Sequence, residues 1–251
     1  MATKKKSYIF ADVIEVEEYH DGRYGAPGTR REKKKKATPE QVAKINQYNK
    51  EKKARRRLRQ YFHENDWFVT LTYRKQERPP DMKTVKKHFR TFITKVRKEY
   101  KKNECEMFWI RNIENNRNNN WHIHLVINDI PDLVKMLNQL WPHGTVHDSK
   151  QLYKRGGFRD LAAYITKDEK STRKDLGEIM DHVVTEASYS TSRNMPLKPP
   201  KERVLKRWQE EPKAKQGWYI DKDSFFEGIN PVTGYKYRHY SMFRIDIHRR
   251  I

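Results

Sequence analysis

The chain has 251 residues, with 55 Lys and Arg against 33 Asp and Glu, so its formal net charge is +22. This length fits one medium-sized domain with extensions or two small domains. Aromatic residues make up 12% of the sequence, which is enough for a folded core and argues against wholesale disorder. The excess positive charge predicts a polyanionic partner, most commonly nucleic acid, although a basic structural protein has the same composition.

Two features of the sequence indicate the cellular compartment. The single cysteine, Cys105, excludes an internal disulfide and a CxxC zinc site and favours a reducing compartment. No apolar run approaches the roughly 18 residues that a membrane span requires, and the first residues lack the apolar segment of a signal peptide. We therefore expect a soluble, cytoplasmic protein with no membrane partner.

Residues 1–65 are predicted to form a basic N-terminal extension. Within residues 1–60, Lys and Arg outnumber Asp and Glu by more than two to one. Residues 8–19 alternate in the manner of a strand, and residues 22–37 are predicted as a basic loop. This segment is therefore expected to be an electrostatic element separate from the rest of the chain.

A long basic helix is predicted over residues 38–64. Thr38 and Gln41 form a capping box, with Pro39 at the first helical position. The helix carries six positive charges in eight residues with no acid among them: Lys52, Lys53, Arg55, Arg56, Arg57 and Arg59. This density exceeds what a solvated face requires, so Arg55, Arg56 and Arg57 are predicted to contact DNA phosphates.

The segment 66–200 is predicted to be an α+β core. Residues 68–73 are rich in β-branched and aromatic side chains and predict a buried strand. Asp81 is a helix cap before apolar residues at helical spacing: Val85, Phe89, Phe92, Ile93, Val96 and Tyr100. Residues 107–114 and 121–128 predict an antiparallel hairpin around an Asn-rich turn. Further elements are expected as a helix at 131–141, a strand or loop at 144–153 and a helix at 157–167.

The segment 201–251 is predicted to be a C-terminal extension that packs on the core. A short helix ending at residue 208 is expected after Pro196, Pro199 and Pro200. Residues 217–247 predict an aromatic-rich pair of strands.

Two histidines in the predicted hairpin are candidate metal ligands. Strand alternation sends Ile123 to one face and both His122 and His124 to the other, where two imidazoles and a third oxygen ligand can hold a divalent cation. Glu114 on the preceding strand has the same parity as His122, and Asn112 is the alternative. Such a set suits Mg²⁺ or Mn²⁺ acting as a Lewis acid. The alternative interpretation is two histidines on a solvated sheet face.

The predicted helix at 157–167 carries a candidate nucleophile. Its apolar stripe leaves Tyr164 and Lys167 together on another face, because they are spaced i, i+3. A nearby cation or metal favours the phenolate, which is the nucleophilic form of tyrosine. The alternative is a half-buried tyrosine beside a surface lysine.

Together these segments resemble the HUH endonucleases, in particular the rolling-circle replication initiators of small phages, plasmids and integrated elements. Residues 65–73 are similar to the first motif of that family, residues 122–124 to its metal motif and residues 164–167 to its tyrosine motif, in the family's order. Residues 188–194 are similar to a Ser/Arg-Asn segment in phage-type relatives. The second tyrosine of some relatives is missing here, so a single-tyrosine enzyme is expected.

The resemblance implies a central five-stranded antiparallel sheet with helices packed on it, and a nicking and joining reaction. His122, His124 and Glu114 are expected to hold Mg²⁺ or Mn²⁺ on the scissile phosphate of single-stranded or hairpin origin DNA. Tyr164 is expected to attack and leave a 5′-phosphotyrosine, with Lys167 stabilising charge or positioning the tyrosine. Arg193 and Asn194 are expected DNA contacts.

The sequence has no GxxxxGK[ST] motif, so a host helicase is an expected partner, in a bacterium that carries a phage or mobile element. Three alternatives stay open. A mobilisation relaxase or a single-strand transposase would use the same chemistry, although relaxases usually place the tyrosine before the histidines. A DNA-binding protein without catalytic activity would share only the charge.

Overall fold

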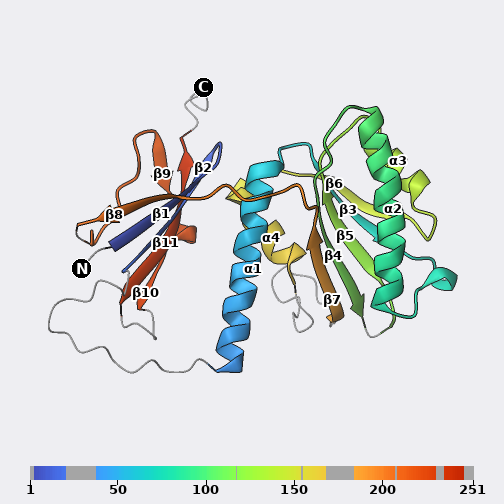
Figure 1. Cartoon of the computed structure of the whole chain (residues 1–251), viewed down its shortest axis with the longest axis horizontal. Coiled ribbons are helices and arrows are strands. Elements are labelled where there is room, and N and C mark those ends of the chain that lie inside the picture. The colour runs from blue at the N-terminus through green and yellow to red at the C-terminus, as the bar shows by residue number, and fades with distance from the viewer. Residues whose placement is uncertain are drawn as a thin grey trace. The chain divides into compact units, whose positions relative to one another are not determined.

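The computed structural model describes residues 3–20, 38–116, 118–153, 155–167, 184–206, 208–229 and 235–245. The chain divides into two compact units. The core unit is Ala43–Pro196, and the terminal unit combines Met1–Val42 with Leu197–Ile251. The fold is α+β, as predicted, with two antiparallel sheets and four α-helices among the described residues (Figure 1). No helix in these ranges is long and apolar enough to cross a membrane.

The core unit contains a five-stranded antiparallel sheet, as the sequence led us to expect. Its order is β6-β3-β5-β4-β7, so β5 is the middle strand. The strands are β3 (Trp67–Thr72), β4 (Trp109–Asn116), β5 (His122–Ile127), β6 (Val146–Gln151) and β7 (Val184–Thr191). The predicted hairpin is confirmed as the β4-β5 pair.

Helices cover both faces of this sheet (Figure 1). Helices α2 (Met82–Lys102) and α3 (Leu133–Leu140) pack on one face, and α1 (Pro39–Tyr61) and α4 (Arg159–Ile165) on the other. Short 3₁₀ turns span Lys75–Glu77 and Arg155–Phe158. The apolar positions predicted for α2 are all buried, because their helical spacing forms one stripe against the sheet.

Both predicted helix starts are confirmed by their caps. The Thr38 hydroxyl accepts from the Gln41 N–H at 3.2 Å, and the Gln41 carbonyl oxygen accepts from the Thr38 N–H at 3.0 Å. The Asp81 carboxylate accepts from the Thr84 N–H at 2.7 Å. Each cap satisfies N–H groups that have no partner inside the first helical turn.

The terminal unit contains a six-stranded antiparallel sheet of order β10-β11-β2-β1-β8, with β9 also paired to β11. Its strands are β1 (Thr3–Ile9), β2 (Val13–His20), β8 (Lys201–Leu205), β9 (Trp218–Ile220), β10 (Phe226–Ile229) and β11 (Lys236–Arg244), and a 3₁₀ turn spans Lys222–Ser224. The aromatic-rich strand pair predicted at 217–247 is present as β10 and β11.

Several sequence-based expectations differ from the structure in this unit. The single strand predicted at 8–19 is two strands, because the chain turns back at residues 10–12 and β1 pairs with β2. The short helix predicted before residue 208 is wrong: residues 201–205 form β8, which pairs with β1. Tertiary pairing overrides local preference there. The basic loop predicted at 22–37 lies outside the described residues.

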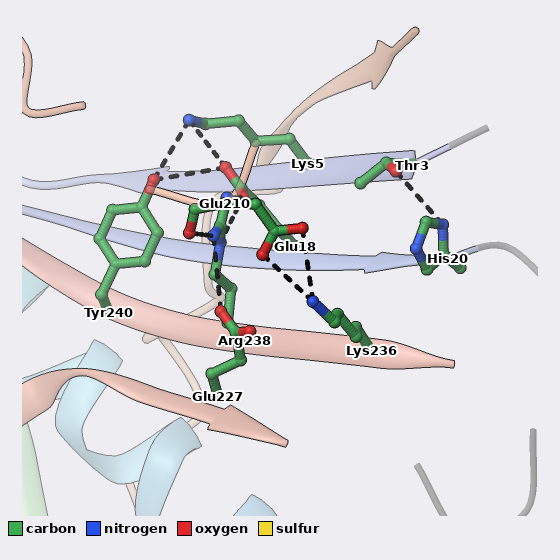
Figure 2. A network of polar contacts seen from close by, with 9 residues as sticks. All are labelled: Thr3, Lys5, Glu18, His20, Glu210, Glu227, Lys236, Arg238 and Tyr240. Carbon is green, nitrogen blue, oxygen red and sulfur yellow. Dashed lines mark hydrogen bonds and ion pairs between the residues drawn. The ribbon is translucent and has the colours of Figure 1, made fainter. Parts of the chain in front are cut away.

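The units are also drawn differently from the three predicted segments 1–65, 66–200 and 201–251. β1 and β2 pair with strands from the other end of the chain, whereas α1 packs on the core sheet. The predicted extensions at the two ends thus share one sheet. Inside it, Arg238 forms an ion pair with Glu18 and lies over the Trp208 ring (Figure 2).

Candidate active site

The two candidate histidines lie on the middle strand of the core sheet. Alternation along β5 sends Ile123 into the core under α2 and the histidines to the opposite face. The strand register pairs His122 with Glu114 and His124 with Asn112. These four residues therefore share one face, which is the parity that the sequence predicted.

His124 is the centre of this face. Its Nδ1 shares a hydrogen bond of 3.1 Å with the Thr70 hydroxyl, and its ring stacks on Phe68 at a centroid distance of 5.9 Å. Its Nε2 lies 3.5 Å from Oε2 of Glu114 and 3.3 Å from the Tyr164 hydroxyl. Thr70 and Phe68 thus fix the ring so that Nε2 faces the carboxylate and the phenol.

Glu114 presents an ionised carboxylate to this site. Burial raises the pKa of Glu114, but its hydrogen bond and charge interaction with His124, the charge of Lys167 and the Asn112 amide lower it further, so the pKa lies below its ordinary value. The Asn112 amide donates to Oε1 of Glu114 at 3.0 Å and to the Lys167 carbonyl at 3.3 Å. Oδ1 of Asn112 is buried without a hydrogen-bond partner among the described residues.

Tyr164 and Lys167 meet at the end of α4. Ala162 and Ile165 of this helix are buried against the sheet, which leaves Tyr164 half-buried above His124 with ring centroids 5.1 Å apart. The Lys167 ammonium lies 4.4 Å from the centroid of the Tyr164 ring. The phenol and the ammonium therefore converge, as the i, i+3 spacing predicted.

Helix α1 holds the tyrosine helix at both ends. Nε of Arg59 donates to the Gly157 carbonyl at 2.8 Å, before α4 begins. Nε2 of Gln47 donates to the Thr166 carbonyl at 2.9 Å, where α4 ends. No sequence pattern signals these two side chains, because their partners are backbone atoms about a hundred residues further along the chain.

The metal expected from the sequence can be weighed against the donor groups of this face. Two imidazoles and one carboxylate are suitable ligands for a divalent cation, and a hydrogen bond to Nδ1 is typical of a histidine that binds metal through Nε2. The buried Oδ1 of Asn112 adds an oxygen atom in need of a partner. In the described parts of the chain, however, no three His, Cys, Asp or Glu residues are already arranged around one ion.

The elements that carry this site follow one another along the chain, from β3 through β4 and β5 to α4. Residues 66–169 match the family model of replication-associated proteins of the ORF2 type. The match contains Thr70, Glu114, His124, Tyr164 and Lys167. It is consistent with a rolling-circle replication initiator and indicates a role in replication initiation. Comparison with curated proteins and with solved structures gave no match.

The arginines predicted to contact DNA on α1 precede the segment that matches the replication-associated family and have partners within the core unit. Arg56 is buried, and Nη1 of Arg55 lies 3.6 Å from Oε1 of Glu51. Nε of Arg57 donates to the Met195 carbonyl at 3.3 Å. The structure thus gives them packing roles, and their contact with DNA stays a prediction.

The two predicted contacts after the matched segment are both exposed. The Asn194 amide donates to Oε1 of Glu106 at 2.9 Å and to the Met107 carbonyl at 3.2 Å. Arg193 lines a cavity beside α2. The two residues follow β7, and alternation directs the neighbouring side chains of that strand to opposite sheet faces.

Proposed function

We propose that this protein is a metal-dependent endonuclease that nicks and rejoins single-stranded origin DNA to initiate rolling-circle replication. One observation carries the proposal: the Tyr164 hydroxyl lies 3.3 Å from Nε2 of His124, on the sheet face that also presents Glu114. A hydroxyl nucleophile, an imidazole and an ionised carboxylate within hydrogen-bond reach form a reactive centre. The match to the replication-associated family supports the replication role.

The proposed reaction is a transesterification. The Tyr164 oxygen attacks phosphorus, the bond between phosphorus and the 3′ oxygen breaks, and the upstream fragment leaves with a protonated 3′-hydroxyl. The downstream fragment keeps its 5′ phosphate as a diester of Tyr164. This diester preserves the energy of the broken bond, so that the 3′-hydroxyl of another strand end can reverse the step and rejoin DNA without ATP.

We assign His122, His124 and Glu114 as the residues that would hold Mg²⁺ or Mn²⁺. The cation would polarise the scissile phosphate as a Lewis acid. Thr70 keeps Nε2 of His124 directed into the site through its bond to Nδ1, and the lowered pKa of Glu114 keeps that carboxylate charged at neutral pH.

Lys167 is assigned to the nucleophile. Its ammonium lies over the Tyr164 ring, and a cation near a phenol favours the phenolate form. The same charge stabilises the negative charge that develops on the phosphate during attack. The DNA partner is single-stranded or hairpin origin DNA, and a host helicase would unwind the duplex.

Formation of a covalent adduct tests the proposal. The full chain is incubated with labelled single-stranded origin DNA and Mn²⁺, and the adduct is detected on a denaturing gel. The wild type and the control Tyr153→Phe, whose tyrosine is 72% exposed, should form the adduct, whereas Tyr164→Phe and a sample with excess chelator should not. An adduct of normal yield in Tyr164→Phe would overturn the proposal.

A further inference from the structure

A cavity of about 700 Å³ lies between helix α2 and strands β4 and β7. Trp109 and Arg111 line it from β4, and alternation along that strand sends Asn112 and Glu114 to the other face. The cavity is therefore on the sheet face opposite the Tyr164 site. Among the described residues that line it there is no Asp or Glu, but there are five cations: Lys86, Arg90, Arg97, Arg111 and Arg193.

Arg111 is the innermost of these cations. It is 7% exposed, Nη1 donates to the Ser188 carbonyl at 2.9 Å, and the guanidinium lies 4.9 Å from the centroid of the Phe89 ring. Its Nε is buried with no hydrogen-bond partner, and no carboxylate pairs with it, in the part of the chain that the structure describes. Burial lowers the pKa of Arg111 to about 10.

A buried guanidinium without an acid is costly, because its charge has lost water and gained no opposite charge. Nε1 of Trp109, on the same strand, is a second buried donor without a partner among the described residues. Both groups line the cavity. An anion in the cavity would supply the charge and the acceptor atoms that these groups lack.

The outer part of the cavity extends along helix α2. Lys86, Arg90 and Arg97 are exposed and lie on one helix face, since they are spaced i, i+4 and i+11. None of them forms an ion pair with a described residue. From Lys86 to Arg97 the helix rises about 16 Å, which is longer than a single phosphate group and suits a chain of phosphates.

We propose that this cavity binds the phosphate backbone of single-stranded DNA, as a second contact separate from the Tyr164 site. The identity of the ligand rests on the proposed function, whereas the anionic chemistry rests on Arg111 and the cations of α2. Because the two sites lie on opposite faces of one sheet, the cavity contacts a different part of the strand from the scissile phosphate.

Two charge-matched double variants of the full chain test this site. Arg90→Gln with Arg97→Gln removes two cavity cations, and Lys95→Gln with Lys98→Gln removes two exposed cations of α2 that do not line the cavity. Affinity for a labelled single-stranded oligonucleotide is measured by fluorescence anisotropy over a series of salt concentrations.

The cavity variant should bind about tenfold more weakly than the control, which corresponds to about 1.4 kcal/mol. Its salt dependence should also be shallower, by a slope of about 1.4 for two lost phosphate contacts. Equal affinities and equal slopes in the two double variants would overturn the proposal.

Arg111→Met tests the inner part of the cavity. This variant should also lose affinity relative to the wild type, with an unchanged circular dichroism spectrum. If it does not fold, the exposed positions on α2 still decide. A free deoxynucleoside monophosphate that stabilises the wild type, combined with equal oligonucleotide affinity in the double variants, would indicate a free-nucleotide site and overturn the DNA assignment.

Adduct formation by the wild type separates this proposal from the preceding one. If the wild type forms no adduct but the cavity variant binds DNA more weakly than its control, the proposed reaction fails and the cavity assignment stands. If the adduct forms and the two double variants bind alike, the cavity assignment fails alone.

Discussion

Each of the two sheets buries an arginine, and the two arginines have opposite surroundings. In the terminal unit, Arg238 lies 2.6 Å from Oε2 of Glu18 and 3.5 Å from Oε2 of Glu227, and it donates to the Glu210 carbonyl at 3.0 Å (Figure 2). In the core unit, Arg111 has one carbonyl and one ring as its partners.

The difference separates structural charge from functional charge. Glu18 also pairs with Lys5 at 3.0 Å and accepts from the Tyr240 hydroxyl at 3.3 Å, so the network in the terminal unit closes on itself. Burial raises the pKa of Tyr240, which stays a neutral donor there. In the core unit, Arg111, His124 and Glu114 instead face spaces where a phosphate can bind. Four substitutions test this contrast.

The largest effect is expected at His124. His124→Ala removes an assigned metal ligand and the partner of the Tyr164 hydroxyl, so the rate of adduct formation should fall about a thousandfold, a loss of about 4 kcal/mol of transition-state stabilisation. Single-turnover assays measure this rate. His63→Ala, at an exposed histidine, is the matched control. An unchanged rate in His124→Ala would remove the core site from the contrast.

The next effect is a loss of stability at Glu18. Glu18→Gln leaves Arg238 buried without its closest charge, which should lower the free energy of unfolding by about 3 kcal/mol. Denaturant unfolding followed by circular dichroism measures the loss, and Glu211→Gln at an exposed position is the control. The folded fraction should still form the adduct. Equal stability of the two variants would show that the network contributes little.

A smaller effect is expected at Thr70, which positions His124. Thr70→Val removes the hydroxyl that holds Nδ1 and should lower the rate of adduct formation about tenfold to a hundredfold, with a higher Mn²⁺ concentration needed for half-maximal rate. Thr70→Ser should restore both values. A rate loss without any change in the Mn²⁺ requirement would indicate a packing role only.

The smallest effect concerns the stability of Arg111. Arg111→Met replaces an unpaired buried charge with an apolar chain, so the free energy of unfolding without DNA should change by about 1 kcal/mol or less, or increase. The same denaturant experiment measures it beside Glu18→Gln. A loss as large as that of Glu18→Gln would mean that Arg111 is a structural charge like Arg238.

The sequence predicted what local periodicity determines. The buried stripe of α2, the two helix caps and the shared parity of Glu114 and His122 all follow from spacings within one element or one hairpin. Alternation is enough to place two histidines on one face. The convergence of Tyr164 with Lys167 is likewise set within one turn of helix.

The sequence could not predict contacts between distant segments. The pairing of β1 with β8 joins the two ends of the chain, and local preference at 201–205 favoured a helix in place of a strand. The bond from Thr70 to His124 depends on the β3-β5 register, and the inward direction of Arg56 depends on how α1 packs. The unpaired state of Arg111 is visible only once its neighbours are known.

The central claim is that Tyr164 forms a covalent bond with DNA, and peptide mapping by mass spectrometry tests it most directly. After reaction with single-stranded origin DNA and Mn²⁺, followed by nuclease and protease digestion, the account predicts a nucleotide linked through its 5′ phosphate to the peptide that contains Tyr164. A nucleotide on a peptide without Tyr164, or a cleaved strand with no modified peptide, would contradict the account.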